Sequence, residues 1–204
     1  MTIDEETYRI FQRVGKEVLI RNLGSSHSGN ISIRSGGKII IKKRAAMLGW
    51  LEPEDLIECA LDKEDSSSLL ASTELGVHRA IYQETDAMAV VHTHSPYSVV
   101  LSMIEDEITC IDAEGMFMYK KIPVVELNVP SGSSEAATRV PPILKNYPVC
   151  VVRSHGVFAK GITLEDALQN VTGAEFSAQI RYLTMLTGKP LKRDYSKEKD
   201  FGSW

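Results

Sequence analysis

The chain has 204 residues, a length typical of one domain with a substantial buried core. Hydrophobic residues make up 43% and charged residues 25%, so the composition is that of a globular protein and excludes a fibrous or disordered chain. The formal net charge of -4 argues against a nucleic-acid or anionic-membrane partner, and no uninterrupted apolar run reaches the roughly 18 to 20 residues that a membrane span needs. We therefore expect a protein that acts on small molecules.

The first part of the chain alternates helical and strand patterns. Apolar residues recur at three- and four-residue steps after Asp4, which predicts an amphipathic helix. A long run of turn-forming residues follows, and Gly36-Gly37 then joins two alternating segments as an antiparallel hairpin. The expected elements are a helix over 4–21, strands over 31–34 and 38–42, a helical turn over 53–56 and a strand over 57–61.

The second part contains longer helices and buried strands. Ser72 and Thr73 resemble helix caps, which would place Glu74 in the first turn of the helix that follows. Thr163 caps a long helix that Gly188 closes. The other expected elements are strands over 88–94, 122–129, 149–153 and 156–160, a helix over 97–103, and a helix over 134–145 that is interrupted at Pro141-Pro142.

This alternation predicts a single α/β domain over residues 1–204. We expect three layers, α/β/α, with helices on both sides of a central mixed, mostly antiparallel sheet, because several strands are joined by short hairpins. The tail from about residue 192 is polar and is predicted to be mobile, with Phe201 and Trp204 able to dock on another surface.

The cysteines and the N-terminus indicate a cytoplasmic protein. Cys59, Cys110 and Cys150 are far apart and form no CxxC motif, so they are predicted to be reduced core residues. The acidic residues after Met1 do not resemble the basic start of a secretory signal.

Two histidines stand two residues apart at the end of an apolar strand. Alternation along the strand points His92 and His94 to one face, which predicts a grip for zinc or a neighbouring transition metal. His155 follows another apolar strand and precedes Gly156, so it is the natural third ligand. Three ligands leave one coordination position open, as in catalytic sites. The alternative is that these are ordinary histidines packed at strand ends.

Glu74 has more than one reading. It could be a carboxylate that the helix dipole favours, and its spacing from His78 also resembles a pair of ligands on one helix face.

A wider set of motifs resolves these choices. The chain resembles the class II aldolase/adducin family from about residue 8 to residue 187. The resemblance rests on the stretches Gly29-Asn30-Ile31-Ser32-Ile33-Arg34, Ser72-Thr73-Glu74-Leu75 with His78 and Tyr82-Gln83, Val91-His92-Thr93-His94-Ser95, and Ser154-His155-Gly156.

The resemblance implies that His92, His94 and His155 hold one zinc ion per subunit, for which another divalent transition metal could substitute. It also implies that Glu74 is the catalytic acid/base and can approach the metal in the free enzyme. The expected reaction is cleavage of a small phosphorylated ketose to dihydroxyacetone phosphate and an aldehyde through a metal-stabilised enediolate.

The resemblance further implies a phosphate site built from Gly29, Asn30, Ser72 and Thr73. Where the family has a Thr-Gly pair, this chain has Arg44-Ala45, with Lys43 beside it. These charges either bind a phosphate or carboxylate or are ordinary solvated residues, and we favour Arg44 as part of the phosphate site. His27 and Ser28 lie in the same loop as Asn30, where an exposed loop histidine is the ordinary interpretation.

The family's aldolases also use tyrosines from a neighbouring subunit and from a C-terminal tail. This chain has Asp112, Glu114 and Tyr119 in the first region and Tyr195 and Trp204 in its tail, so the second proton donor is unassigned. The resemblance implies a homotetramer with sites between subunits. Alternative activities within the family are pentulose-phosphate 4-epimerase, sugar-phosphate dehydratase and decarboxylase, and a remote alternative is a non-catalytic adducin-like binding module.

Overall fold

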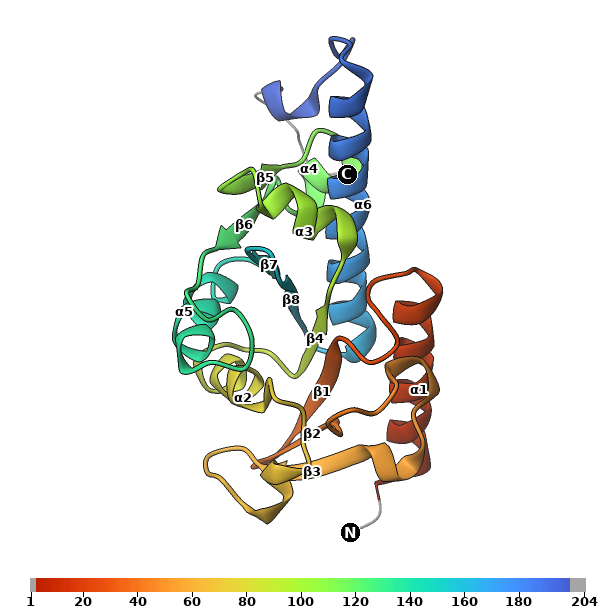
Figure 1. Ribbon diagram of the computed structural model, residues 1–204, viewed down its shortest axis with the longest axis vertical. Coiled ribbons are helices and arrows are strands. Elements are labelled where there is room, and N and C mark those ends of the chain that lie inside the picture. Colours follow the sequence, from red (N-terminus) through yellow and green to blue (C-terminus); the bar gives the residue numbers. More distant parts are fainter. Residues whose placement is uncertain (1–2, 199–204) are drawn as a thin grey trace.

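The computed structural model describes residues 3–198. Within these residues, eight strands form one sheet in the order β3-β2-β1-β4-β8-β7-β6-β5, with helices on both faces (Figure 1). Every neighbouring pair of described strands is antiparallel except β6 and β7. The predicted three-layer α/β/α fold with a mixed, mostly antiparallel sheet is confirmed.

The elements follow the chain in a regular alternation. The described helices are α1 (Glu5–Ile20), α2 (Leu75–Glu84), α3 (Pro96–Ser102), α4 (Ala113–Met118), α5 (Ser134–Leu144) and α6 (Leu164–Thr187). The described strands are β1 (Asn30–Ser35), β2 (Lys38–Lys42), β3 (Leu56–Ala60), β4 (Ala89–Thr93), β5 (Glu107–Thr109), β6 (Lys121–Val125), β7 (Val149–Val152) and β8 (Gly156–Gly161). Short 3-10 turns lie at η1 (Leu48–Trp50), η2 (Pro53–Asp55), η3 (Ser66–Leu69) and η4 (Tyr195–Lys197).

The core has one cluster on each face of the sheet. Phe11 of α1 and Val171 of α6 belong to the larger cluster, and α3 and α4 extend it. Ile81 of α2 and Val140 of α5 belong to the smaller cluster on the opposite face. Figure 1 shows these two helices at the left. Because both faces are covered, β4 and β7 are buried along their whole length rather than alternating between buried and exposed.

The long helix α6 has the ends that the sequence predicts. The Thr163 hydroxyl accepts a hydrogen bond from Asp166 N–H, and the Asp166 carboxylate accepts one from Thr163 N–H, which together form a capping box. At the other end Gly188 has φ +62, the left-handed conformation that glycine adopts without strain.

Three local predictions are wrong. The first turn of α2 begins at Leu75, so Glu74 is the capping residue before it rather than part of it; the Ser72 hydroxyl accepts from Glu74 N–H at 3.3 Å in the turn that precedes the helix. Helix α5 continues through Pro141 and Pro142, because burial of Val140, Pro141 and Leu144 compensates for the missing backbone donors.

Strand β6 ends at Val125, short of the predicted end at residue 129, and pairs with β7 only through its last two residues. The Glu135 carboxylate accepts hydrogen bonds from the backbone of Asn128 and Val129, which folds this segment into a loop. Strand β5 and helix α4 have no counterpart in the sequence analysis.

The described part of the predicted mobile tail is held to the body of the protein. Tyr195 packs against the larger core cluster and its N–H donates to Ile111 O at 3.3 Å. Phe201 and Trp204 lie outside the described residues. Among the described helices, none is both long and apolar enough to cross a membrane.

Substitution of Glu175 tests how helix α6 holds the start of helix α3. This buried carboxylate of α6 accepts from Tyr97 N–H, Ser98 N–H and the Ser98 hydroxyl at 2.8, 2.9 and 2.7 Å, and so fixes the start of α3. Glu175→Ala should lower the free energy of unfolding by about 2–4 kcal/mol, because it leaves buried donors without partners. Glu175→Gln, which keeps one carbonyl acceptor, should cost less. Equal denaturant midpoints for all three proteins would contradict this role.

Candidate metal centre and substrate pocket

The two histidines of the HxH motif lie at the end of β4, next to β1 and β8. His92 is opposite Asn30 in β1 and opposite Phe158 in β8. Its ring stacks on that of Phe158, with centroids 4.0 Å apart and an interplanar angle of 17°. His94 lies just beyond the strand, where its N–H donates to Leu23 O, and its ring centroid is 5.1 Å from that of His92.

The third histidine lies in the tight turn between β7 and β8. The His155 ring centroid is 4.8 Å from the centroids of both His92 and His94. This approach depends on Gly156, where a Cβ atom would lie 2.3 Å from Thr93 O and 2.9 Å from His92 Cε1. One ring nitrogen from each of the three histidines lies within 4.8 Å of the other two, so this trio could hold a metal ion.

Hydrogen bonding and burial prepare these nitrogens for a metal. His92 Nδ1 donates to Val157 O at 2.9 Å, so the proton is on Nδ1 and Nε2 carries a free lone pair. The Nε2 atom is buried and has no hydrogen-bond partner within residues 3–198. Burial lowers the pKa of His92 well below its ordinary value, and His155 and His94 add to the effect. Burial, aided by His94, also lowers the pKa of His155 to about 4. The neutral imidazoles that metals prefer are therefore favoured.

Glu74 lies beside this trio with its carboxylate buried. Its Oε1 atom is 3.8 Å from His155 Nε2 and accepts from the Ser131 hydroxyl and from Gly132 N–H, both at 3.0 Å. Its Oε2 atom is buried without a hydrogen-bond partner among the described residues. Burial raises the pKa of Glu74, and the bonds from Ser131 and Gly132 oppose that rise. Burial thus makes this carboxyl group easier to protonate than that of an exposed glutamate.

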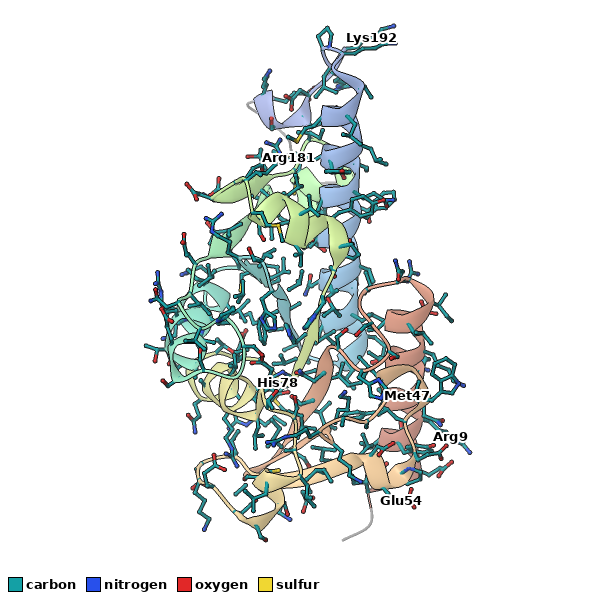
Figure 2. The ribbon with its side chains drawn as sticks, viewed as in Figure 1. Arg9, Met47, Glu54, His78, Arg181 and Lys192 are labelled. Carbon is teal, nitrogen blue, oxygen red and sulfur yellow. The ribbon has the colours of Figure 1, made fainter. Side chains whose placement is uncertain are left out.

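His78 is not part of this cluster. Figure 2 shows it on the inner side of α2, and its ring is completely buried. Its Nδ1 atom lies 2.6 Å from the Ser32 hydroxyl, which in turn contacts the Tyr82 hydroxyl. The spacing of Glu74 and His78 therefore reflects the packing of α2 on the sheet, and not a pair of metal ligands.

All of the predicted site residues line one pocket of about 150 Å³. Two lining residues were missed by the sequence analysis, Lys42 and Ser131. Asn30 is buried, and its Oδ1 atom lacks a partner among the described residues, whereas Thr73 and Arg44 are exposed at the pocket. The predicted residues that line it are Gly29, Asn30, Arg44, Ser72, Thr73, Glu74, His92, His94 and His155.

Lys42 is the unexpected cation of this pocket. It is 3% exposed, and its ammonium group donates to the carbonyl oxygens of His27 and Ala46 at 3.1 and 2.7 Å. Burial lowers its pKa to about 8. No carboxylate of residues 3–198 forms an ion pair with it. The sequence offered one sign of this role, because Lys42 ends the apolar strand 38–42 and a lysine is rarely buried unless its charge has a partner.

Lys43 and Arg44 differ in their position. Arg44 lines the pocket, whereas Lys43 does not. Lys43 follows the end of β2, where its backbone forms a bridge to Ala71. Ala45, in the place of the family's glycine, lines the pocket with φ +60. His27 lines the pocket from an exposed loop, with its Nδ1 atom 2.9 Å from the Ser26 hydroxyl.

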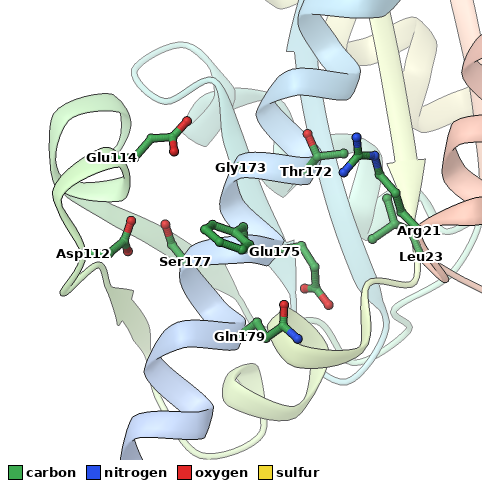
Figure 3. A pocket seen from close by; sticks show the side chains of 10 residues that line it. Arg21, Leu23, Asp112, Glu114, Thr172, Gly173, Glu175, Ser177 and Gln179 are labelled. Carbon is green, nitrogen blue, oxygen red and sulfur yellow. The ribbon is translucent and has the colours of Figure 1, made fainter.

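A second cavity, of about 350 Å³, lies between α4, α6 and the end of α1 (Figure 3). Two of its acidic residues are engaged elsewhere, since Asp112 caps α4 through Gly115 N–H and Glu175 holds the start of α3. Tyr119 is buried at the end of α4 against Gly173. These residues add no catalytic group to the histidine pocket within this chain.

Comparison of the sequence with models of known families identifies its family. Residues 10–182 match the model of the class II aldolase and adducin N-terminal domain. The chain belongs to the class II aldolase and adducin family. The predicted family is thereby confirmed.

Two relatives share most of their length with this chain. It is 31% identical to the L-fuculose phosphate aldolase of Methanocaldococcus jannaschii, over 88% of this chain and 97% of the relative. The crystal structure of L-fuculose-1-phosphate aldolase from Thermus thermophilus is 34% identical, with a TM-score of 0.84 over 90% of this chain and 97% of that one. These similarities identify the chain as a lyase of the aldolase type.

A more distant relative has a different activity. The chain is 27% identical to the 3-oxo-tetronate 4-phosphate decarboxylase of Pectobacterium atrosepticum, over 84% of this chain and 86% of the relative. Membership of the family therefore leaves both the substrate and the bond that is broken to be argued from the site.

Substitution of Gly156 tests the geometry of the histidine trio. The added Cβ atom of Gly156→Ala would collide with Thr93 O and press on the rings of His92 and His94. Affinity for zinc, measured by competition with a chromophoric chelator, should fall about 10- to 100-fold. Gly37→Ala is a matched control, because its Cβ atom would meet nothing within 4 Å. Unchanged affinity in Gly156→Ala would contradict this account of the turn.

Proposed function

We propose that this protein is a zinc-dependent aldolase that cleaves a small phosphorylated ketose, similar to fuculose 1-phosphate, to dihydroxyacetone phosphate and an aldehyde. The observation that carries the proposal is the single pocket in which three neutral histidines lie beside a buried glutamate and two cations. The names of the two aldolase relatives support a sugar phosphate as the substrate.

His92, His94 and His155 would hold one zinc ion per subunit, and another divalent transition metal could substitute. The fit is supported by the buried, bare Nε2 atom of His92, since a polar nitrogen without a partner is costly unless a ligand satisfies it. When bound, such an ion supplies Lewis acidity that favours the enediolate of the dihydroxyacetone phosphate unit.

Glu74 would act as the acid/base. In cleavage, the Glu74 carboxylate would take the proton of the hydroxyl group that becomes the aldehyde oxygen, while the carbon–carbon bond breaks and its electron pair passes to the enediolate. Glu74 would then give this proton to the enediolate carbon that lost its bond. In the reverse direction the carboxylate removes the same proton. Burial, which raises the pKa of Glu74, favours the protonated form that gives its proton to the enediolate. In the free enzyme, Glu74 would also be able to approach the metal directly.

The phosphate would lie at the other end of the pocket. Asn30, Ser72 and Thr73 offer neutral donors there, as the family resemblance implies. Lys42 and Arg44 add two positive charges. An ammonium group that is buried without a carboxylate partner gains most from an anionic ligand, because the ligand compensates for its lost hydration. Arg44, which stands where the family has the threonine of its Thr-Gly pair, would add a second charge to this anion site.

The second candidate is another reaction at the same site. The decarboxylase relative supports it, and an epimerase or dehydratase would use the same histidines and glutamate. A non-catalytic adducin-like module is disfavoured by the buried donors and charges that such a module would not need. We also propose a homotetramer with sites at subunit interfaces. We further propose a cytoplasmic location, which is supported by the three free, buried cysteines.

A panel of phosphorylated ketoses tests the reaction. The zinc-loaded protein should release dihydroxyacetone phosphate from at least one of them, as detected through its enzymatic reduction with NADH, and His92→Ala should not. Conversion of a pentulose phosphate to its epimer without cleavage would replace the aldolase proposal with an epimerase. Decarboxylation of a 3-oxo acid phosphate without ketose cleavage would favour the decarboxylase.

Arg44 and Lys43 form a matched pair for testing the anion site. Arg44→Ala removes a charge from the pocket and should raise KM for a phosphorylated ketose about ten-fold, with kcat changed less than about two-fold. Lys43→Ala removes a charge outside the pocket and should leave KM unchanged. Equal KM values for the two variants would make Arg44 an ordinary solvated residue.

Zinc affinity should vary little with pH. Only neutral imidazole binds metal, and the lowered pKa values of His92, His94 and His155 keep these rings neutral as the pH falls. Three ordinary histidines would lose about ten-thousand-fold in affinity between pH 7.5 and 5 through competition by protons. Here the loss should be less than about a hundred-fold, as measured by chelator competition. A loss above about a thousand-fold would contradict the buried, neutral trio.

A further inference from the structure

One loop reaches across the pocket to hold the Glu74 carboxylate. It joins β6 to α5, and two of its groups, the Ser131 hydroxyl and Gly132 N–H, donate to the same oxygen, Oε1, at 3.0 Å each. The other oxygen, Oε2, receives no hydrogen bond from the described residues. The loop therefore distinguishes the two oxygens of one carboxylate.

The oxygen that the loop holds is the one near the histidines. Oε1 lies 3.8 Å from His155 Nε2. Carboxylate oxygens are good ligands for zinc, so an ion held by the histidine trio would compete for the same lone pairs. Two donors on Oε1 weaken that competition, because an oxygen has two lone pairs and both already accept hydrogen bonds, so one of these bonds must be given up before Oε1 can bind a metal.

The loop is fixed without help from the Ser131 side chain. The Glu135 carboxylate accepts from Asn128 N–H at 2.9 Å and from Val129 N–H at 3.2 Å, and the Ser133 hydroxyl donates to Val129 O at 2.6 Å. Gly132 has φ +59 and approaches Thr73 so closely that a Cβ atom would lie 3.1 Å from Thr73 O. Ser131 itself is exposed at the pocket. Its hydroxyl can therefore be removed with the loop in place.

We propose that Ser131 is a positioning residue that weakens the binding of Glu74 to the metal and keeps this carboxylate available for proton exchange with the substrate. The Ser131 hydroxyl and Gly132 N–H hold Oε1 beside the histidine trio, so that any approach to the metal is readily reversed. The open coordination position is then kept for the substrate. This inference rests on the proposed function and adds a residue that the family resemblance did not identify.

Removal of the hydroxyl should shift Glu74 toward the metal. In Ser131→Ala only the Gly132 N–H holds Oε1, so the variant should bind zinc about ten-fold more tightly than the wild type. Its kcat for ketose cleavage should fall about ten-fold, because the base is occupied, with KM nearly unchanged. Ser131→Thr, which keeps a hydroxyl, should restore both values.

The test uses the full-length protein loaded with zinc for kinetics and with Co²⁺ for spectroscopy. Chelator competition gives the affinity, and visible absorption of Co²⁺ reports the number of ligands, which should increase in Ser131→Ala. Ser134→Ala, at the first residue of α5, is the control for loss of a hydroxyl in the same segment and should match the wild type. In a Glu74→Gln background, Ser131→Ala should no longer tighten zinc binding.

The outcomes separate this inference from the proposed function. If the wild type binds no zinc or cleaves no ketose phosphate, the proposed function fails. If the wild type does both and Ser131→Ala has the same zinc affinity, Co²⁺ spectrum and kcat, only the role of Ser131 is wrong. Weaker zinc binding in Ser131→Ala, or the same tightening in the Glu74→Gln background, would also contradict the inference.

Discussion

The antiparallel ladder between β4 and β8 joins segments that are 65 residues apart at His92 and Val157. It places the end of the HxH strand against the turn that carries His155, and a ladder carbonyl fixes the tautomer of His92. Gly156 permits the close approach at that turn. The candidate metal centre therefore depends on the sheet itself, which holds the three histidines more rigidly than mobile loops would.

Burial sets the chemistry of the two kinds of group in opposite directions. Removal from water disfavours the charged form of any side chain, so it lowers the pKa of His155 to about 4 and raises that of Glu74. Neutral histidines are suited to bind a cation, and in the proposed reaction Glu74 would carry a proton between atoms of the substrate. Lys42, buried at the same pocket, is left charged enough to attract an anion.

The sequence was most informative where a residue's role follows from its own strand or turn. His92, His94 and His155 could be placed together because each ends an apolar strand, and Asn30, Ser72 and Thr73 because family motifs carry them. Ser131 could not be found, since its contact with Glu74 crosses 57 residues and forms only because the segment after β6 folds into a loop. Helix α4 was missed for a similar reason: its six residues are too few to show a helical period.

The central claim is that Glu74 exchanges a proton with a substrate bound at the histidine trio. The most direct measurement is exchange of the carbon-bound proton of dihydroxyacetone phosphate for deuterium in D₂O, followed by NMR with no aldehyde present. The zinc-loaded wild type should exchange one proton stereospecifically. Glu74→Gln should keep one zinc ion per subunit and exchange at least about a hundred-fold more slowly. Equal rates in the two proteins, or no exchange by the zinc-loaded wild type, would contradict the account.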